Sequence, residues 1–302
     1  MTALKTILYF SIFNYPVTRD EIFKFSTSEN IDILDNELEI LLKRKIIYQI
    51  GDYYLNTQSL DSVKRRLTNN KMAEKIMPKA LRISKRIASF PYVKGVALSG
   101  GLSKGCFDSE GDVDFFIITS PNKLWLARTL LILYKKIFLL NSKKYFCVNY
   151  FIGSNNLNIT EKNKFTAMEL VTLIPTYGQS IFKEFMSNNK WVKGYFPNKN
   201  IEENFSLVSD TKKPIISKLI EFILNNKFGD FLDTQFRIMT LNVWNKKFKH
   251  LHNVDFNIAM KSTKNVSKHH PNNFQKKVIE ALNENYNHVK QKHEIILEPE
   301  HA

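Results

Sequence analysis

Cysteine is scarce in this sequence, which has only Cys106 and Cys147 among its 302 residues. Two cysteines cannot form the several bridges of a disulfide-stabilised extracellular scaffold, and their scarcity suits a reducing compartment. The first residues, Met1 to Lys5, also lack the charged and then apolar layout of a secretory signal peptide. We therefore expect a cytoplasmic location.

Long uninterrupted apolar runs are missing as well. The most apolar long stretch, residues 124–140, contains Arg128, Lys135 and Lys136. It is also shorter than the roughly 20 residues that a membrane-spanning helix needs. We expect no membrane partner. Because 43% of the residues are nevertheless apolar, the chain can form packed cores and is too apolar to be disordered.

Negative charge is in short supply: 29 acidic residues against 44 lysines and arginines give a net charge of +15. Such a balance favours a nucleic acid or nucleotide as partner, because Lys and Arg raise the local concentration of polyanions. The excess is nearly all lysine and comes with abundant Asn, Ile and Phe, a mixture that a coding bias also produces. The net charge alone therefore does not decide between the two interpretations.

The first 57 residues follow a pattern of three helices and a β-hairpin. Apolar spacing predicts a first helix that ends before Pro16, and Thr18 with Glu21 is typical of a capping box that starts a second helix. A third helix is expected over residues 32–44, and a hairpin follows with Gly51-Asp52 at its turn. This order resembles a winged helix-turn-helix module.

In a DNA-binding winged helix the third helix enters the major groove. Here that helix is acidic, and its basic residues lie only at its end. The acids are Asp32, Asp35, Glu37 and Glu39, and the basic residues are Lys43 to Lys45. Phosphates would repel the acidic side chains. DNA binding by this module is therefore kept as an alternative but not favoured, and docking on the rest of the chain or on a partner is preferred.

The remainder of the chain divides into three segments. Residues 58–90 are expected to form a basic connector helix. Residues 91–164 are expected to form strands at 93–99, 113–119 and 145–152, with a helix over 121–140 that Ser120 and Pro121 start. Residues 165–302 are expected to be mainly helical, with one helix over 166–186 and the last over 274–292. The fold class expected is α+β, and His269-His270-Pro271 is expected to be a loop rather than a metal site.

A glycine pair marks the end of the first strand of the central segment. Gly100 and Gly101 lack β-carbons, so that backbone N–H groups in a tight turn can approach a phosphate closely. Ser103 and Lys104 add a hydroxyl and a cation. The sequence therefore predicts an anion site that suits phosphates at this turn.

A carboxylate pair follows the glycines. Asp112 and Asp114 lie two residues apart at the expected start of the next strand, so their side chains would share one face of the sheet. Two carboxylates beside a phosphate cradle are what a Mg²⁺ site for nucleotide chemistry requires, because hard oxygen ligands hold the ion and the ion bridges to substrate phosphates.

The segment from the strand before Gly100 to the strand after Asp114 resembles the nucleotidyltransferases of the DNA polymerase β superfamily, in particular the small branch called minimal nucleotidyltransferases. The shared pattern is an apolar strand, a Gly-Gly or Gly-Ser pair, a gap of about ten residues, and Asp-apolar-Asp followed by apolar residues. It covers residues 92–152. The resemblance implies a central mixed sheet with flanking helices, Mg²⁺ or Mn²⁺, and an NTP as substrate.

The same resemblance implies a reaction in which an NMP moves from the NTP to a hydroxyl group on a small molecule, a protein or an RNA. Asp112 and Asp114 would be the catalytic residues and the metal ligands. The triphosphate would be bound by Gly100, Gly101, Ser103 and Lys104.

One position departs from the family pattern. Active members carry a third carboxylate on a later strand, where it helps to hold the catalytic metal and accepts the acceptor's proton. The corresponding residue here is Asn149, which can ligate a metal but cannot act as a base. Glu169 on the following helix is a candidate replacement; otherwise the acceptor is activated differently or catalysis is impaired. A second interpretation is therefore a weak or inactive nucleotide-binding regulatory protein whose winged helix contacts DNA or protein.

Overall fold

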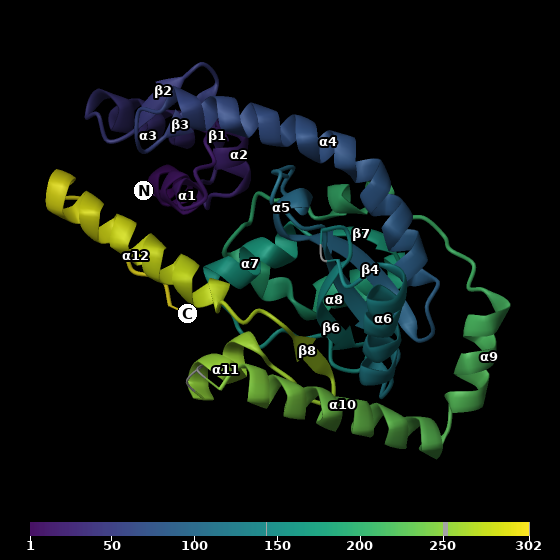
Figure 1. The fold of residues 1–302 in the computed structure, drawn as a ribbon. Helices are drawn as coiled ribbons and strands as arrows, with labels where there is room; N and C mark the ends of the chain where they lie inside the picture. Colours follow the sequence, from purple (N-terminus) through teal and green to yellow (C-terminus); the bar gives the residue numbers. More distant parts are fainter. Residues whose placement is uncertain (143, 250–252, 302) are drawn as a thin grey trace.

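The computed structural model describes residues 1–142, 144–249 and 253–301 and has a mixed α+β fold. Figure 1 shows an N-terminal group of helices at one end, a long helix that leads away from it, and a central sheet with helices around it. The last helices of the chain return towards the N-terminal group. Among the described residues, no helix combines the length and the apolar character that crossing a membrane demands.

The N-terminal module consists of three helices and a small antiparallel sheet of order β1-β3-β2. Its elements are α1 (Thr2–Ser11), β1 (Val17–Thr18), α2 (Arg19–Lys24), α3 (Ile31–Lys43), β2 (Tyr48–Ile50) and β3 (Tyr53–Leu55). The predicted capping box is confirmed, because the Glu21 backbone N–H donates to the Thr18 hydroxyl and the Glu21 carboxylate accepts from the Thr18 N–H. The three helices and the hairpin therefore follow the predicted order.

The acidic side chains of α3 have partners inside this module. Glu37 accepts hydrogen bonds from the backbone N–H groups of Thr2 (3.0 Å) and Leu4 (3.2 Å) at the start of α1. These N–H groups have no partner within the helix, and a carboxylate at a helix N-terminus satisfies them. Asp35 forms an ion pair with Arg19. Two of the acids on α3 thus hold the module together.

A helix is present where residues 58–90 were expected to form one: α4 (Leu60–Ala88) runs from the module to the sheet (Figure 1). Arg66 fixes its first turns to the module: the guanidinium donates to the Glu21 carboxylate at 2.7 and 2.8 Å and also to the Pro16 carbonyl. It lies over the rings of Tyr15 and Tyr53, at 4.4 and 4.6 Å from their centroids. The module and α4 are therefore joined by a buried cation.

The central sheet has five strands in the order β7-β4-β5-β6-β8. β4 (Val93–Ser99) and β5 (Asp114–Thr119) are antiparallel, whereas β5 and β6 (Cys147–Gly153) are parallel and joined through α6 (Leu124–Phe138). The three strands expected between residues 91 and 164 are thus present, with ends that differ by up to two residues. The register brings Ser99 and Cys147 to either side of Asp114.

The prediction of one helix over residues 166–186 is wrong. The chain instead forms α7 (Lys164–Val171), β7 (Ile174–Tyr177) and α8 (Gln179–Asn188). Pro175 lacks a backbone N–H and so favours an edge strand over a helix interior. Gly178 then turns the chain with φ of 83°, where a β-carbon would collide with the Lys94 carbonyl. β7 pairs with β4 and forms one edge of the sheet.

A second strand, β8 (Val266–Lys268), was also missed and forms the opposite edge beside β6. Both edges of the sheet therefore come from the part of the chain expected to be mainly helical. The expected start of the 121–140 helix is wrong as well: α6 begins at Leu124, because Asn122 has φ of 56°, and the Lys123 N–H closes a turn onto the Ser120 carbonyl.

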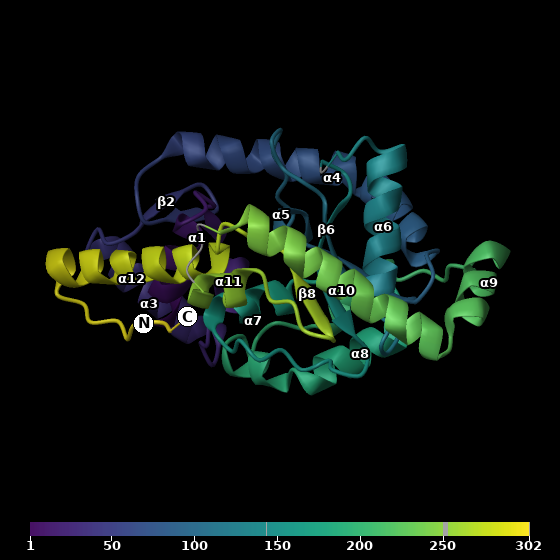
Figure 2. The same cartoon turned by 60° about the horizontal axis from the view of Figure 1, so that its bottom comes forward.

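The other elements after β7 are helical, as predicted. They are the 3₁₀ helices η1 (Lys190–Gly194) and η2 (Glu202–Leu207), then α9 (Ile215–Leu224), α10 (Lys227–Lys247), α11 (Asn253–Ala259) and α12 (Phe274–His293). α12 lies beside α1 in both views (Figures 1 and 2). Asn285 donates to the Leu8 carbonyl (3.4 Å), and Arg44 donates to the His293 carbonyl (3.0 Å). The two ends of the described chain thus pack on each other next to the sheet.

Candidate functional site

The glycine pair lies directly opposite Asp114. The register of β4 and β5 pairs Ser99 with Asp114, and the chain then turns into α5 (Gly100–Ser103). Gly100 has φ of 64°, in the left-handed region that favours glycine. A β-carbon at Gly100 would also collide with Oδ2 of Asp114. Gly100 is therefore required twice, for its backbone conformation and for its close approach to the carboxylate.

Gly101 closes the loop that follows. Its carbonyl accepts from the backbone N–H groups of Lys104 and Cys106, both at 3.0 Å. A β-carbon at Gly101 would lie 2.9 Å from the Cys106 carbonyl oxygen, which is too close for any other side chain without a shift of the backbone. The loop between β4 and β5 is thus compact because both glycines are present.

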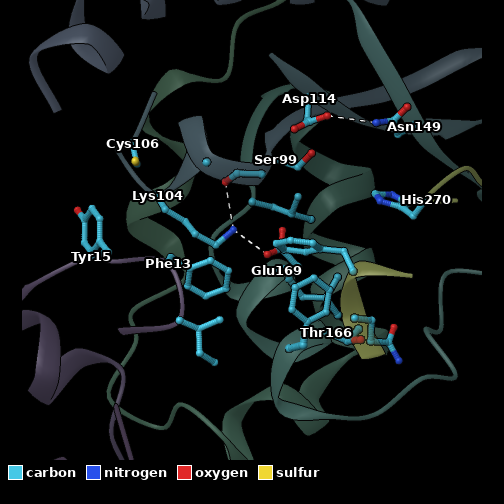
Figure 3. Close-up of a pocket in the computed structure, with 18 of the residues that line it drawn as sticks. Phe13, Tyr15, Ser99, Lys104, Cys106, Asp114, Asn149, Thr166, Glu169 and His270 are labelled. Atoms are coloured by element: carbon cyan, nitrogen blue, oxygen red, sulfur yellow. Dashed lines mark hydrogen bonds and ion pairs between the residues drawn. The ribbon is translucent and has the colours of Figure 1, made fainter. Parts of the chain in front are cut away.

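Lys104 reaches from this loop towards Glu169 on α7, as Figure 3 shows. Its Nζ forms an ion pair with Glu169 Oε1 at 2.9 Å and donates to the Gly100 carbonyl at 3.1 Å. The Ser103 hydroxyl also donates to the Gly100 carbonyl, at 2.9 Å, but Ser103 lines a smaller neighbouring cavity of about 270 Å³. Lys104 lines both cavities. The predicted cation is therefore at the main site, and the predicted hydroxyl lies beside it.

The Asp114 carboxylate is held among partners from β6. Asn149 Nδ2 donates to Asp114 Oδ1 at 3.2 Å (Figure 3) and lies 2.9 Å from Cys147 Sγ. Burial raises the pKa of Asp114 to about 6, which a hydrogen bond from the Cys147 thiol and the charge of Lys104 partly oppose. The negative charges of Asp112 and Glu169 add to the increase in that pKa. These partners compensate the charged form of Asp114 only in part, since its pKa stays above the ordinary value.

Asn149 occupies an irregular point in the sheet. Phe115 pairs with Val148 and Phe116 pairs with Tyr150, so that Asn149 is the extra residue of a β-bulge on β6. Such bulges re-aim side chains, and here the side chain meets Asp114. The position at which the family pattern has a third acid is therefore in contact with Asp114, but it carries the amide of Asn149.

The two predicted aspartates differ in their relation to β5 and to the main cavity. Asp112 precedes β5 and does not line the main cavity, whereas Asp114 is the first residue of the strand and does. The negative charge of Asp112 nevertheless contributes to the raised pKa of Asp114. Of the predicted residues, the cavity brings together Gly100, Gly101, Lys104, Asp114, Asn149 and Glu169.

The cavity has a volume of about 700 Å³ and lies between the sheet, α4, the end of α1, and the starts of α7 and α12. Its size falls within the usual range for small-molecule sites. Several lining residues carried no functional prediction: Tyr9, Phe13, Glu161, Phe165, Lys268, His270 and Phe274. Tyr9, Phe13, Phe165 and Phe274 have only an apolar or aromatic pattern in the sequence, which equally describes core residues, and the isolated charges of Glu161 and Lys268 form no pattern. The wall of the cavity was therefore not predictable from spacing.

His270 is one of these lining residues. It lies in the expected loop, and burial, assisted by the charge of Lys268, lowers the pKa of its imidazole to about 4. The ring is therefore neutral at pH 7. Burial also lowers the pKa of Lys268. Lys268 lies on β8, a strand that was not predicted from the sequence.

Within the described ranges, no group of three or more His, Cys, Asp or Glu side chains could hold a metal ion. The carboxylate that closely approaches Gly100 is that of Asp114, which accepts a hydrogen bond from the Asn149 amide, and Asp112 lies two residues before it in the sequence. Mg²⁺ commonly binds to one or two carboxylates and takes its other ligands from substrate phosphates and water. The chemistry of this donor set thus fits an ion that arrives with a triphosphate.

The chain matches no protein-family model, and neither the curated proteins nor the solved structures include a match. The functional argument therefore depends on the geometry of this site.

Proposed function

We propose that this protein is a metal-dependent nucleotidyltransferase that moves an NMP from an NTP to a hydroxyl acceptor. The observation that carries the proposal is the close approach of Gly100 to Asp114 at the edge of one cavity. The glycine is what a triphosphate loop needs, and the carboxylate is what a metal needs. The antiparallel pairing of β4 with β5 and the parallel pairing of β5 with β6 agree with the mixed sheet that the polymerase β resemblance implies.

In this proposal Asp114 and Asp112 hold the divalent metal, with the Asn149 amide beside them. The ion would supply Lewis-acid stabilisation of charge on the transferred phosphoryl group. Burial disfavours the charged form of Asp114 and raises its pKa to about 6. A cation beside this carboxylate would stabilise the charged form. The loop with Gly100, Gly101 and Lys104 binds the triphosphate.

Lys104 and Glu169 couple binding to acceptor activation. Lys104 Nζ and Glu169 Oε1 form an ion pair of 2.9 Å. A triphosphate attracts Lys104, and the Glu169 carboxylate is then free to accept a proton. Because Asn149 cannot act as a base, Glu169 is the residue assigned to this task.

The transfer step exchanges one bond at the α-phosphorus for another. The acceptor oxygen forms a bond to the α-phosphorus while its proton passes to Glu169, and the bond from that phosphorus to the bridging oxygen breaks. Pyrophosphate leaves with the electron pair. The products are the nucleotidylated acceptor and pyrophosphate.

The proposal is tested first by binding. A non-hydrolysable ATP analogue with Mg²⁺ is titrated into the full chain and the melting temperature is followed. The wild type is expected to gain stability with ligand concentration, because the ligand binds the folded state alone. Asp114→Asn should lose most of this gain, and Asp108→Asn is the matched control on the same cavity. Equal responses of all three proteins would contradict the metal site.

A second candidate function is nucleotide binding without turnover, and the observation that favours it is the hydrogen bond from Asn149 to Asp114. An amide at this position supplies neither negative charge nor a base. If the wild type binds the nucleotide but releases no pyrophosphate, and Asn149→Asp restores release, the second candidate is correct. Pyrophosphate release by the wild type excludes it.

A DNA-binding regulator is a version of this second candidate. The acids of α3 argue against it, since Glu37 and Asp35 hold the module together and leave that helix negatively charged. Binding of duplex DNA that weakens steeply with salt and survives loss of Asp112 and Asp114 would support it. Absence of binding at low salt would remove it.

A further inference from the structure

One part of the cavity wall is aromatic. Phe13 follows α1, Phe165 lies on α7 and Phe274 begins α12. The Phe274 ring centroid is 6.1 Å from that of Phe13 and 5.9 Å from that of Phe165, so that the three rings form one cluster. Phe274 is still 47% exposed. Three elements from distant parts of the sequence thus leave apolar ring surface beside the site.

The charges that line the cavity are balanced. Four basic side chains face four acidic ones: Arg65, Arg66, Lys104 and Lys268, against Asp108, Asp114, Glu161 and Glu169. Three of the acids already have basic partners, since Lys104 pairs with Glu169, Arg65 with Asp108, and Lys261 with Glu161. A polyanion such as RNA gains little from such a lining, because its binding depends on excess positive charge.

Tyr9 on α1 lines the same cavity and is only 2% exposed. Its hydroxyl has no hydrogen-bond partner among the described residues. A buried hydroxyl without a partner is costly, and such groups are rare in native proteins. The charge of Glu169 acts on the Tyr9 hydroxyl and adds to the increase in its pKa that burial causes. Tyr9 and Glu169 line the same cavity, so a ligand group bonded to Tyr9 would share that cavity with the carboxylate assigned as base.

We propose that the acceptor is a small, uncharged aromatic compound with a hydroxyl group, which packs against Phe13, Phe165 and Phe274 and forms a hydrogen bond with the Tyr9 hydroxyl. This inference rests on the proposed nucleotidyl transfer and names its acceptor class. The N-terminal module then acts as a wall of the acceptor site, because both Tyr9 and Phe13 come from it. The reaction is the one written above, with the aromatic hydroxyl oxygen as the atom that bonds to phosphorus.

The test uses 2-naphthol, an uncharged fluorescent aromatic alcohol, titrated into the full chain without nucleotide at pH 7. Saturable binding is expected. Tyr9→Phe should weaken it about fivefold and Phe13→Ala about tenfold, as expected for loss of one hydrogen bond and of one ring contact. Phe222→Ala, at an 83% exposed position on α9, is the matched control and should bind as the wild type does.

Measurements of folding stability, of RNA competition and of nucleotide binding and transfer complete the test. Tyr9→Phe removes only an unpaired buried hydroxyl, so it should fold at least as stably as the wild type. Equal affinity of all the variants, or displacement of 2-naphthol by a single-stranded RNA, would overturn the inference. Nucleotide transfer to another acceptor without Tyr9-dependent naphthol binding would overturn it while the proposed function stands. Tyr9-dependent binding without any nucleotide binding would refute the proposed function but not the aromatic specificity of the cavity.

Discussion

The contact between Gly100 and Asp114 predicts a large and specific cost for Gly100→Ala. Two effects add. The left-handed backbone, with φ of 64°, costs an alanine ~1–2 kcal/mol. The new β-carbon also collides with Asp114 Oδ2, and overpacking of this kind costs ~1–3 kcal/mol. Gly100→Ala should therefore lower the free energy of unfolding by ~2–5 kcal/mol and displace the carboxylate.

The assay is urea unfolding followed by circular dichroism, with Gly51→Ala as the matched control. Gly51 has φ of 59°, but no atom lies within 4 Å of the position of its added β-carbon, so only the backbone effect is expected there. In an Asp114→Ala background, Gly100→Ala should cost no more than Gly51→Ala does, because the colliding oxygen is gone. If Gly100→Ala and Gly51→Ala cost the same in the wild-type background, the contact that carries the proposed function does not exist.

Three further predictions follow from single contacts. The folded pKa of Asp114, about 6, exceeds its ordinary value of 3.8, so its contribution to stability should fall by ~3 kcal/mol as pH rises from about 4 to about 6. Asp114→Asn should abolish this fall in metal-free urea unfolding, and a parallel pH dependence would contradict it. Lys104→Met should weaken binding of the Mg²⁺-bound ATP analogue about tenfold in thermal shifts, as for loss of one charge-assisted contact; unchanged affinity would exclude Lys104 from the triphosphate site. Glu37→Ala should cost ~1 kcal/mol of stability by removing the acceptor at the start of α1, whereas the exposed Glu39→Ala should cost little; equal costs would refute this role.

Local signals predicted the elements that carry the glycine loop and the carboxylates. The strand before Gly100, the connector α4 and the Thr18 capping box depend on residues close in sequence, and all three are present. The placement of Asn149 beside Asp114 was expected only through the family resemblance. Its cause is a bulge on β6, a feature of strand pairing that spacing along one strand does not reveal.

The two edge strands were missed for a different reason. β7 contains Pro175 and ends before Gly178, and both residues were signals against a helix. β8 is only three residues long, which is too short to show an alternation of apolar and polar residues. It forms where it pairs with the edge of β6. Neither strand has a strong local preference, so tertiary pairing determines both.

The wall of the cavity was the least predictable part. Tyr9, Phe13, Phe165 and Phe274 look like core residues in the sequence, and only the packing of α12 on α1 shows that they line a cavity. Glu169 was a weak candidate in the sequence because a single helix acid carries no pattern. Its ion pair with Lys104 and its place in the cavity wall come from the fold, and spacing along the sequence could not show them.

The central claim is most directly tested by turnover. The full chain is incubated with Mg²⁺, each common NTP labelled at the α-phosphate, and 2-naphthol or a panel of other hydroxyl acceptors, and both pyrophosphate and labelled acceptor are measured. The account predicts equal amounts of the two products with the wild type, little of either with Asp114→Asn, and wild-type amounts with Asp108→Asn. Product formation that is the same with Asp114→Asn as with the wild type would contradict it.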